Sequence, residues 1–129
     1  MQELKGKKVL LIEDDVFITE MIVRRLKMAG ASCAWAKNGE EGLDKLRDAK
    51  FDIVITDLMM AQMMGDEMIK KIKADKELKD IPIVVYSNFV TSKKDFEKIE
   101  KLGVNGIFIK SNTSLGDFIN KIAEILNNK

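Results

Sequence analysis

The sequence contains no histidine, a single cysteine and a single proline. Without histidine, Ser-His and Cys-His catalytic pairs and most zinc sites are excluded, so any bound metal must be held by oxygen atoms. The lone thiol, Cys33, cannot form a disulfide within the chain. No segment resembling a signal peptide begins at Met1, and no apolar run approaches the ~20 residues of a membrane-spanning helix. We therefore expect a soluble protein of the reducing cytoplasm, with no membrane partner.

An excess of charge of one sign is also absent. Lys and Arg number 22 against 21 for Asp and Glu, a formal net charge of +1, so a nucleic-acid partner is not expected. With 129 residues, 46% of them hydrophobic, the chain has the size and composition of one ordinary domain with its own core. We expect a single domain over residues 1–129, with its core at about 8–126, and no room after Asn127 for an output domain.

Short apolar runs alternate with longer amphipathic stretches along the chain. Most of the runs are unbroken, which is typical of parallel strands covered on both faces by helices. Strands are expected at residues 9–12, 33–36, 53–55, 83–86 and 107–109. Trp35, in the second of them, is expected in the core.

Each predicted strand is followed by a helical pattern. Asn38 and Glu41 form a capping box at the second helix, Ser92 begins the fourth, and Gly30 and Gly103 mark helix ends. The apolar stripes are Ile18, Met21, Ile22 and Leu26; Leu43 and Leu46; Met68, Ile69 and Ile72, in a helix from about Asp66; Phe96 and Ile99; and Leu115, Phe118, Ile119, Ile122, Ile125 and Leu126. Such (βα)5 repeats predict an α/β fold, a doubly wound five-stranded parallel sheet in the order 2-1-3-4-5 with helices on both faces.

Polar residues follow four of the predicted strands. They are Glu13, Asp14 and Asp15 after the first, Asp57 after the third, Ser87 and Asn88 after the fourth, and Lys110 after the fifth. The binding crevice of such a sheet lies beyond the carboxyl ends of the strands, where the strand order reverses. Each residue alone has a structural explanation, such as helix capping by Asp15. Together, however, crowded carboxylates repel one another unless a cation lies among them.

Magnesium is the cation that fits these groups, because it prefers oxygen ligands and usually binds one or two carboxylates plus a phosphate oxygen. Asp14 and Asp57 can supply the carboxylates. A carboxylate beside such a cation can act as a nucleophile toward phosphorus and form an aspartyl phosphate. The Lys110 ammonium and the Ser87 hydroxyl would then stabilise the charged oxygens of the transferring group.

Four segments, at residues 9–15, 52–60, 82–87 and 106–110, resemble the receiver domains of two-component response regulators. The likeness extends from Lys8 to about Leu126. It implies a flavodoxin-like fold of the chemotaxis-regulator type. It also implies these site residues: Asp57 as phosphoacceptor, Glu13, Asp14, Asp57 and the Met59 carbonyl as magnesium ligands, and Ser87 and Lys110 as contacts of the phosphoryl group.

The resemblance further implies how such a module works. The donor would be a histidine kinase, a phosphotransfer protein or a small acyl phosphate, and the signal would pass through the fourth helix and fifth strand to a downstream protein. The module would be a phosphorelay switch and not an enzyme that turns over an external substrate. Its switch positions would be Ser87, Asn88 and Ile107.

Several positions depart from the family pattern. Ala61 and Met64 stand before Gly65 in place of the usual proline and Asp-Gly, and Asn88 replaces a small residue. Ile107 stands where an aromatic ring usually turns inward. Ser111 replaces a proline that often follows a cis bond, so this bond is expected either trans or strained cis, a non-proline cis bond costing about 3 kcal/mol. Met63 and Met64 are candidates for a docking surface.

Two alternatives remain. The first, ranked behind the phosphorylation switch, is a pseudo-receiver, in which the departures mean that the fold serves as an interaction module that phosphorylation no longer drives. A metal-dependent hydrolase or nucleotide-binding enzyme is disfavoured, because no glycine-rich phosphate loop follows the first strand.

Overall fold

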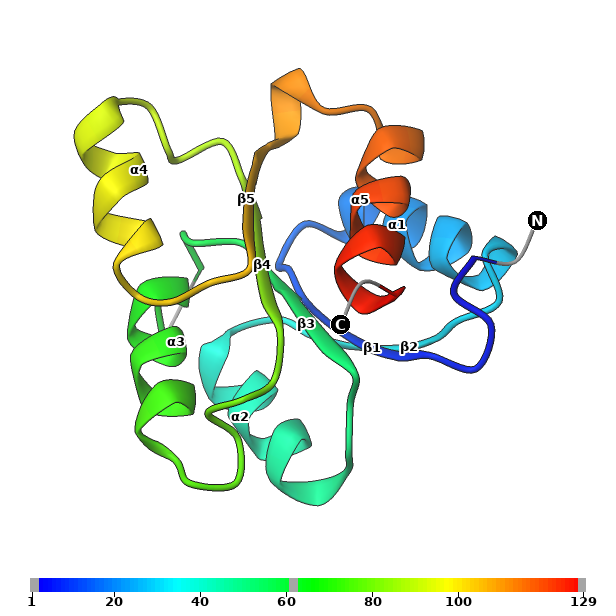
Figure 1. Cartoon of the computed structure of the whole chain (residues 1–129), viewed down its shortest axis with the longest axis horizontal. Helices are drawn as coiled ribbons and strands as arrows, with labels where there is room; N and C mark the ends of the chain where they lie inside the picture. The colour runs from blue at the N-terminus through cyan, green and yellow to red at the C-terminus, as the bar shows by residue number, and fades with distance from the viewer. Residues whose placement is uncertain (1–2, 61–62, 128–129) are drawn as a thin grey trace.

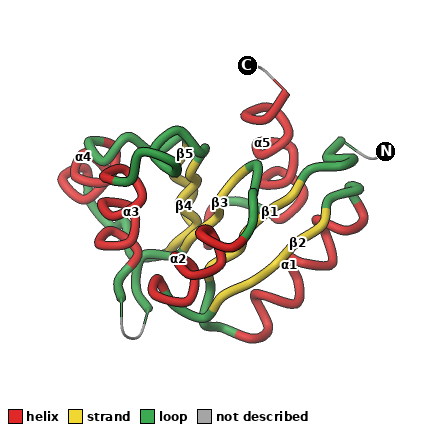
Figure 2. Tube along the Cα trace, turned by 90° about the horizontal axis from the view of Figure 1, so that it is seen from below, coloured by secondary structure: helices red, strands yellow, loops and turns green. Residues whose placement is uncertain are grey.

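The computed structural model describes residues 3–60 and 63–127. Within them, parallel strands form one sheet in the order β2-β1-β3-β4-β5, which confirms the predicted α/β fold and its strand order. In Figure 2 the strands lie side by side from β2 at one edge to β5 at the other. The strands are β1 (Lys8–Ile12), β2 (Ser32–Ala36), β3 (Ile53–Thr56), β4 (Ile83–Ser87) and β5 (Gly106–Ile109). The helices are α1 (Val16–Met28), α2 (Gly39–Asp48), α3 (Gly65–Ala74), α4 (Lys93–Glu100) and α5 (Leu115–Asn127), with a 3-10 turn, η1 (Lys110–Asn112), after β5.

Two hydrophobic cores lie on the two faces of the sheet. Helices α1 and α5 cover one face, and α2, α3 and α4 cover the other (Figure 1). Strand β1 serves both cores, because Val9 and Leu11 pack toward α1 and α5 while Leu10 and Ile12 pack toward α2 and α3. This double burial explains why the central strands have unbroken apolar sequences.

The predicted helix starts are found at their capping residues. The Asp15 carboxylate accepts a hydrogen bond from the Ile18 N–H at 3.0 Å, and the Asn38 side chain accepts one from the Glu41 N–H at 2.9 Å. Ser92 caps α4 in the same way. These caps fix where each helix leaves the rim of the sheet. At the other end of α1, Gly30 has a φ of 96°, a left-handed conformation that reverses the chain into β2.

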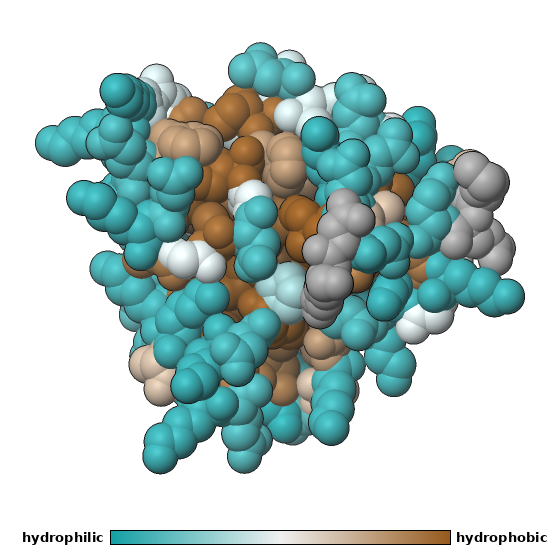
Figure 3. Space-filling model, in the orientation of Figure 1, coloured by the Kyte–Doolittle hydropathy of each residue, from teal (hydrophilic) through white to brown (hydrophobic). Residues whose placement is uncertain are grey.

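Three apolar residues predicted to be buried are exposed. Trp35 is 52% exposed, and Met21 and Phe96 are 54% and 40% exposed. Trp35 lies on the edge strand β2, which has a neighbour on one side only, so the expectation that it is in the core was wrong. The buried residues are Thr19, Ile22 and Leu26 in α1 and Ile99 in α4, so each helix buries a narrower stripe than its sequence pattern predicts. Figure 3 shows further apolar surface between α4 and α5, where β5 forms the opposite edge.

No helix in the described part of the chain is long and apolar enough to cross a membrane.

Candidate functional site

The polar residues predicted at the strand ends gather at one rim of the sheet. Parallel pairing continues one residue past the strands: the Glu13 N–H donates to the Ala36 carbonyl at 2.9 Å, and the Asp57 N–H donates to the Ile12 carbonyl at 3.1 Å. These bonds hold Glu13 and Asp57 side by side at the carboxyl ends of β1 and β3. The backbone hydrogen bonds of the sheet therefore position both carboxylates at this rim.

Three carboxylates form one cluster there. One oxygen each from Glu13, Asp14 and Asp57 lies within 4.8 Å of the others. Glu13 and Asp57 are 4% and 5% exposed, whereas Asp14 faces solvent. The structure thus brings together the acidic residues that the sequence predicted to meet.

Lys110 bridges two of these carboxylates. Its ammonium donates to Asp57 Oδ2 at 2.7 Å and to a Glu13 carboxylate oxygen. The remaining oxygens are held by backbone donors, the Leu58 N–H on Asp57 Oδ1 at 2.7 Å and the Asp15 N–H on Glu13 Oε2 at 3.1 Å. Buried charges are tolerated when they are paired and hydrogen-bonded in this way.

The proton affinities reflect this packing. Burial raises the pKa of Glu13 above its ordinary value, and the Lys110 and Asp15 hydrogen bonds offset it only in part. Burial alone would lower the pKa of Lys110, but hydrogen bonds and charge from Asp57 and Glu13 outweigh that effect and raise it. The Lys110 ammonium therefore stays charged at neutral pH, poised beside Asp57.

The donor set fits a magnesium ion. All three groups of the cluster offer carboxylate oxygens, and the exposed Asp14 leaves one side open to water, which magnesium retains as ligands. The cluster carries three carboxylates against one ammonium, so it attracts a divalent cation.

Ser87 and Asn88 lie at the same rim, at the end of β4. The Ser87 side chain is completely buried, and its oxygen accepts a hydrogen bond from the Phe89 N–H at 3.1 Å. The Asn88 side-chain oxygen accepts one from the Ser111 N–H at 2.9 Å. No cis peptide bond occurs among the described residues, so the Lys110–Ser111 bond is trans, the first of the two expected outcomes.

The methionines after β3 have divided environments. Met60 is buried and Met63 is half-buried against the core, whereas Met59 and Met64 are exposed. Of the two candidates for a docking surface, only Met64 presents its side chain to solvent. Ala61 lies outside the described residues.

The family of this chain follows from comparison with known proteins. The family model for the response regulator receiver domain matches residues 9–123. The chain belongs to the response-regulator receiver family. It is 31% identical over 128 residues to chemotaxis protein CheY-3 of Vibrio cholerae and covers 95% of each chain. It is 35% identical over 80 residues to the phosphate regulon transcriptional regulatory protein PhoB of Pseudomonas aeruginosa, a match that spans 62% of this chain and 35% of that protein.

Solved receiver structures show the same architecture. The chemotaxis response regulator CheY4 of Vibrio cholerae superposes with a TM-score of 0.85 at 28% identity, over 93% of this chain and 98% of that one. Receiver domains are signalling switches that interact with histidine kinases and downstream targets and generally bind Mg²⁺ at an acidic pocket. The resemblance on which the sequence prediction rested is confirmed.

Sequence reasoning missed one residue that shapes the receiver rim. A Cβ on Gly65 would lie 2.2 Å from the Asp57 carbonyl oxygen and 2.8 Å from the Leu58 Cα, so only glycine fits. The Gly65 N–H also donates to the Leu58 carbonyl at 2.8 Å. The start of α3 is thereby packed directly against the backbone of Asp57. A glycine so soon after the strand was the available signal, but its contact depends on how the intervening loop folds back.

Proposed function

We propose that this receiver is a phosphorylation switch that accepts a phosphoryl group on Asp57 in a two-component phosphorelay. The observation that carries the proposal is the Lys110 ammonium, which lies between the buried Asp57 and Glu13 carboxylates beside the exposed Asp14. A structural ion pair needs only one carboxylate per lysine. A second buried carboxylate with a third beside it is instead the arrangement expected for handling a dianionic phosphoryl group and its counter-ion.

The proposed reaction is a transfer from phosphohistidine, or from a small acyl phosphate, to the Asp57 carboxylate. An Asp57 oxygen forms a bond to phosphorus as the bond from phosphorus to the donor breaks. The departing group, which is the imidazole of phosphohistidine or the carboxylate of the acyl phosphate, keeps that electron pair. Lys110 then pairs with a phosphoryl oxygen, because Asp57 has lost its own negative charge in becoming an acyl phosphate. The Ser87 hydroxyl, which has a proton to donate, turns toward another phosphoryl oxygen.

Magnesium would be held by Glu13, Asp14, Asp57 and the Met59 carbonyl. When bound, it supplies positive charge that offsets the charge on the phosphoryl oxygens. Asp14 is the residue best placed for direct coordination, since it is exposed and no hydrogen bond or ion pair of its carboxylate is found among the described residues. Glu13 is buried and paired with Lys110, so in binding magnesium it would also keep the Lys110 ammonium in place.

The partner that delivers the phosphoryl group must approach this rim. Two exposed apolar residues, Val16 and Phe17, begin α1 immediately after the acidic cluster, and Phe17 is 77% exposed. Apolar side chains left this open beside a reaction site are typical of a protein-binding surface. We propose that a histidine kinase or phosphotransfer protein docks there.

The signal would leave through the loop after β4. The Ser87 oxygen now accepts a hydrogen bond from the Phe89 N–H. When the hydroxyl turns toward the phosphoryl group this bond breaks, so the loop that leads into α4 must rearrange. Asn88 joins this loop to the turn after β5. The change would therefore reach α4 and β5, whose edge carries the apolar surface in Figure 3, where a downstream protein can bind. Ile107 is half-buried and aliphatic, so we expect the loop rather than residue 107 to carry the change.

The test is incubation with magnesium and acetyl phosphate followed by intact mass measurement. The wild-type protein should gain one phosphoryl group, and Asp57→Asn should gain none. In Asp14→Ala, magnesium should no longer promote the gain of a phosphoryl group. A wild-type protein that gains no mass under these conditions would contradict the proposal and favour the pseudo-receiver, an interaction module that works without phosphorylation.

A further inference from the structure

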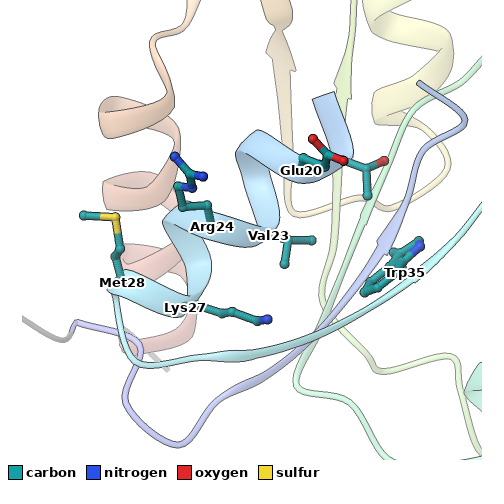
Figure 4. A pocket seen from close by; sticks show the side chains of 7 residues that line it. Glu20, Val23, Arg24, Lys27, Met28 and Trp35 are labelled. Atoms are coloured by element: carbon teal, nitrogen blue, oxygen red, sulfur yellow. The ribbon is translucent and has the colours of Figure 1, made fainter. Parts of the chain in front are cut away.

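A cavity lies between α1 and the edge strand β2. Its volume is about 570 Å³. Val23, Met28 and the Trp35 indole supply its apolar lining, and Trp35 is half-exposed although it is the largest side chain type in proteins. Figure 4 shows Val23 directed from α1 into the space on the side of Trp35. None of these residues belongs to the proposed phosphorylation site.

The cavity adjoins an open sheet edge. Strand β2 pairs with β1 and with no other described strand. Ser32 donates to the Lys7 carbonyl and Ala36 accepts from the Glu13 N–H, so both face β1. Because successive residues of a strand point to opposite sides, the backbone N–H and C=O groups of Cys33 and Trp35 face outward. An unblocked edge of this kind is a template for another strand.

Two cations flank the cavity. Arg24 and Lys27 line it from α1, and neither has a carboxylate within 4.0 Å in the described part of the chain. Lys27 lines the cavity together with Trp35 and so lies beside the edge strand β2. Glu20 is the one carboxylate in the lining, so the cavity carries an excess of positive charge.

The positive charge beside β2 disfavours pairing of this edge with a second copy of the chain. Antiparallel pairing of β2 with its own copy about a two-fold axis would place the two α1 helices side by side on the same face of the joined sheet. Arg24 and Lys27 would then face the same cations of the copy, and like charges brought together are destabilising. An acidic partner meets the same surface with complementary charge.

We infer that the β2 edge binds an acidic peptide segment of a partner protein as an added strand. The bound segment would form backbone hydrogen bonds to Cys33 and Trp35. An apolar side chain would lie on the Trp35 indole, and carboxylates would face Lys27 and Arg24. Parallel pairing keeps in-register residues on one face, so Trp35, which is opposite Leu11, stands on the α1 side where these cations are. This role is independent of phosphoryl transfer.

The test uses the fluorescence of Trp35, the only tryptophan in the chain. The probe is a capped peptide of about six residues, the usual strand length. Threonine alternates in it with glutamate, valine and glutamate, in that order, so that the two glutamates and the valine lie on one face of the strand. Saturable binding with a blue shift of Trp35 emission is expected, weakened by salt. The matched control peptide has lysine in place of glutamate and should leave the emission unchanged.

Two comparisons decide between strand addition and simple charge attraction. N-methylation of one alternate set of peptide amides should abolish binding, while methylation of the other set should not, because only alternate N–H groups face β2. The double variant R24E/K27E should bind the glutamate peptide at least ~10-fold more weakly and should gain binding of the lysine peptide. K70E/K71E, with the same charge change on exposed residues of α3, should behave as wild type.

Three results would overturn the inference. Equal binding of the lysine peptide would remove the charge argument, and equal effects of the two methylated sets would remove strand addition. A shift of Trp35 emission with protein concentration alone, accompanied by dimer formation in sedimentation, would assign the edge to a second copy.

Discussion

The Asn88 side chain is hydrogen-bonded to the backbone N–H of Ser111, with Oδ1 and N 2.9 Å apart. This bond joins the loop that begins after Ser87 to the turn that contains Lys110, the two segments expected to contact a phosphoryl group. Proline has no N–H, so the bond requires a residue other than proline at position 111. The two departures from the family pattern at Asn88 and Ser111 are therefore linked by one contact.

We predict that Asn88→Ala and Ser111→Pro are non-additive. Each single change removes the same hydrogen bond, which contributes about 0.5–1.5 kcal/mol to the free energy of unfolding. In the Ser111→Pro background, Asn88→Ala should therefore have little further effect. Urea unfolding of the four proteins measures the coupling energy. Fully additive losses would show that the bond does not contribute in solution, and Asn112→Ala, at an exposed neighbouring position, serves as the control.

Lys110→Ala should slow phosphorylation without weakening the binding of magnesium. Removing a positioned charge from a reacting oxygen typically lowers the rate about 100-fold or more. The affinity for magnesium should not fall, because the ammonium that competes for the Glu13 and Asp57 carboxylates is gone. Phosphorylation rates from intact mass and magnesium affinities from calorimetry test both parts. Loss of magnesium binding in this variant would mean that Lys110 organises the whole cluster and is not a contact of the phosphoryl group alone.

Gly65→Ala should disturb the site through its backbone. The added methyl group would overlap the Asp57 carbonyl oxygen, and the segment at the start of α3 must move to relieve that contact. We expect a loss of about 1–3 kcal/mol in the free energy of unfolding and slower phosphorylation. Gly116→Ala is the matched control, because its nearest neighbour, the Arg25 side chain, is 3.6 Å away and α5 should gain helix propensity. A Gly65→Ala protein as stable and reactive as wild type would contradict the tight packing.

The sequence predicts this fold well because its signals are local and repeated. Unbroken apolar runs define the strands, and capping residues such as Asp15, Asn38 and Ser92 define where helices begin. Convergence of Asp57 and Lys110 followed from the rule that parallel strands end at one rim. The exposure of Trp35 did not follow, since the residue composition of β2 does not show how completely α1 covers that edge. The contacts of Gly65 and Asn88 also depend on the paths of two loops, which no periodicity specifies.

Cys33 provides a prediction on pH. Burial raises the pKa of its thiol from 9.0 to about 11, and the nearby charge of Lys27 offsets only part of this. The folded protein therefore keeps the Cys33 proton over a range in which the unfolded chain loses it. Since the unfolded state then binds fewer protons, the free energy of unfolding should fall as the pH rises from about 9 to 11. Below that range the thiol is protonated in both states, and its contribution is constant.

Two measurements check this prediction. The folded protein should react with iodoacetamide at pH 8 far more slowly than the urea-unfolded chain, because only the thiolate is nucleophilic. The decline in the free energy of unfolding between pH 9 and 11 should be shallower in Cys33→Ala than in wild type, while other titrating groups, among them Tyr86 and Lys110, contribute equally to both. Lys27→Gln should slow the alkylation further, since it removes the charge that favours the thiolate. Identical slopes in wild type and Cys33→Ala would mean that the thiol is as well solvated in the folded protein as in the unfolded chain.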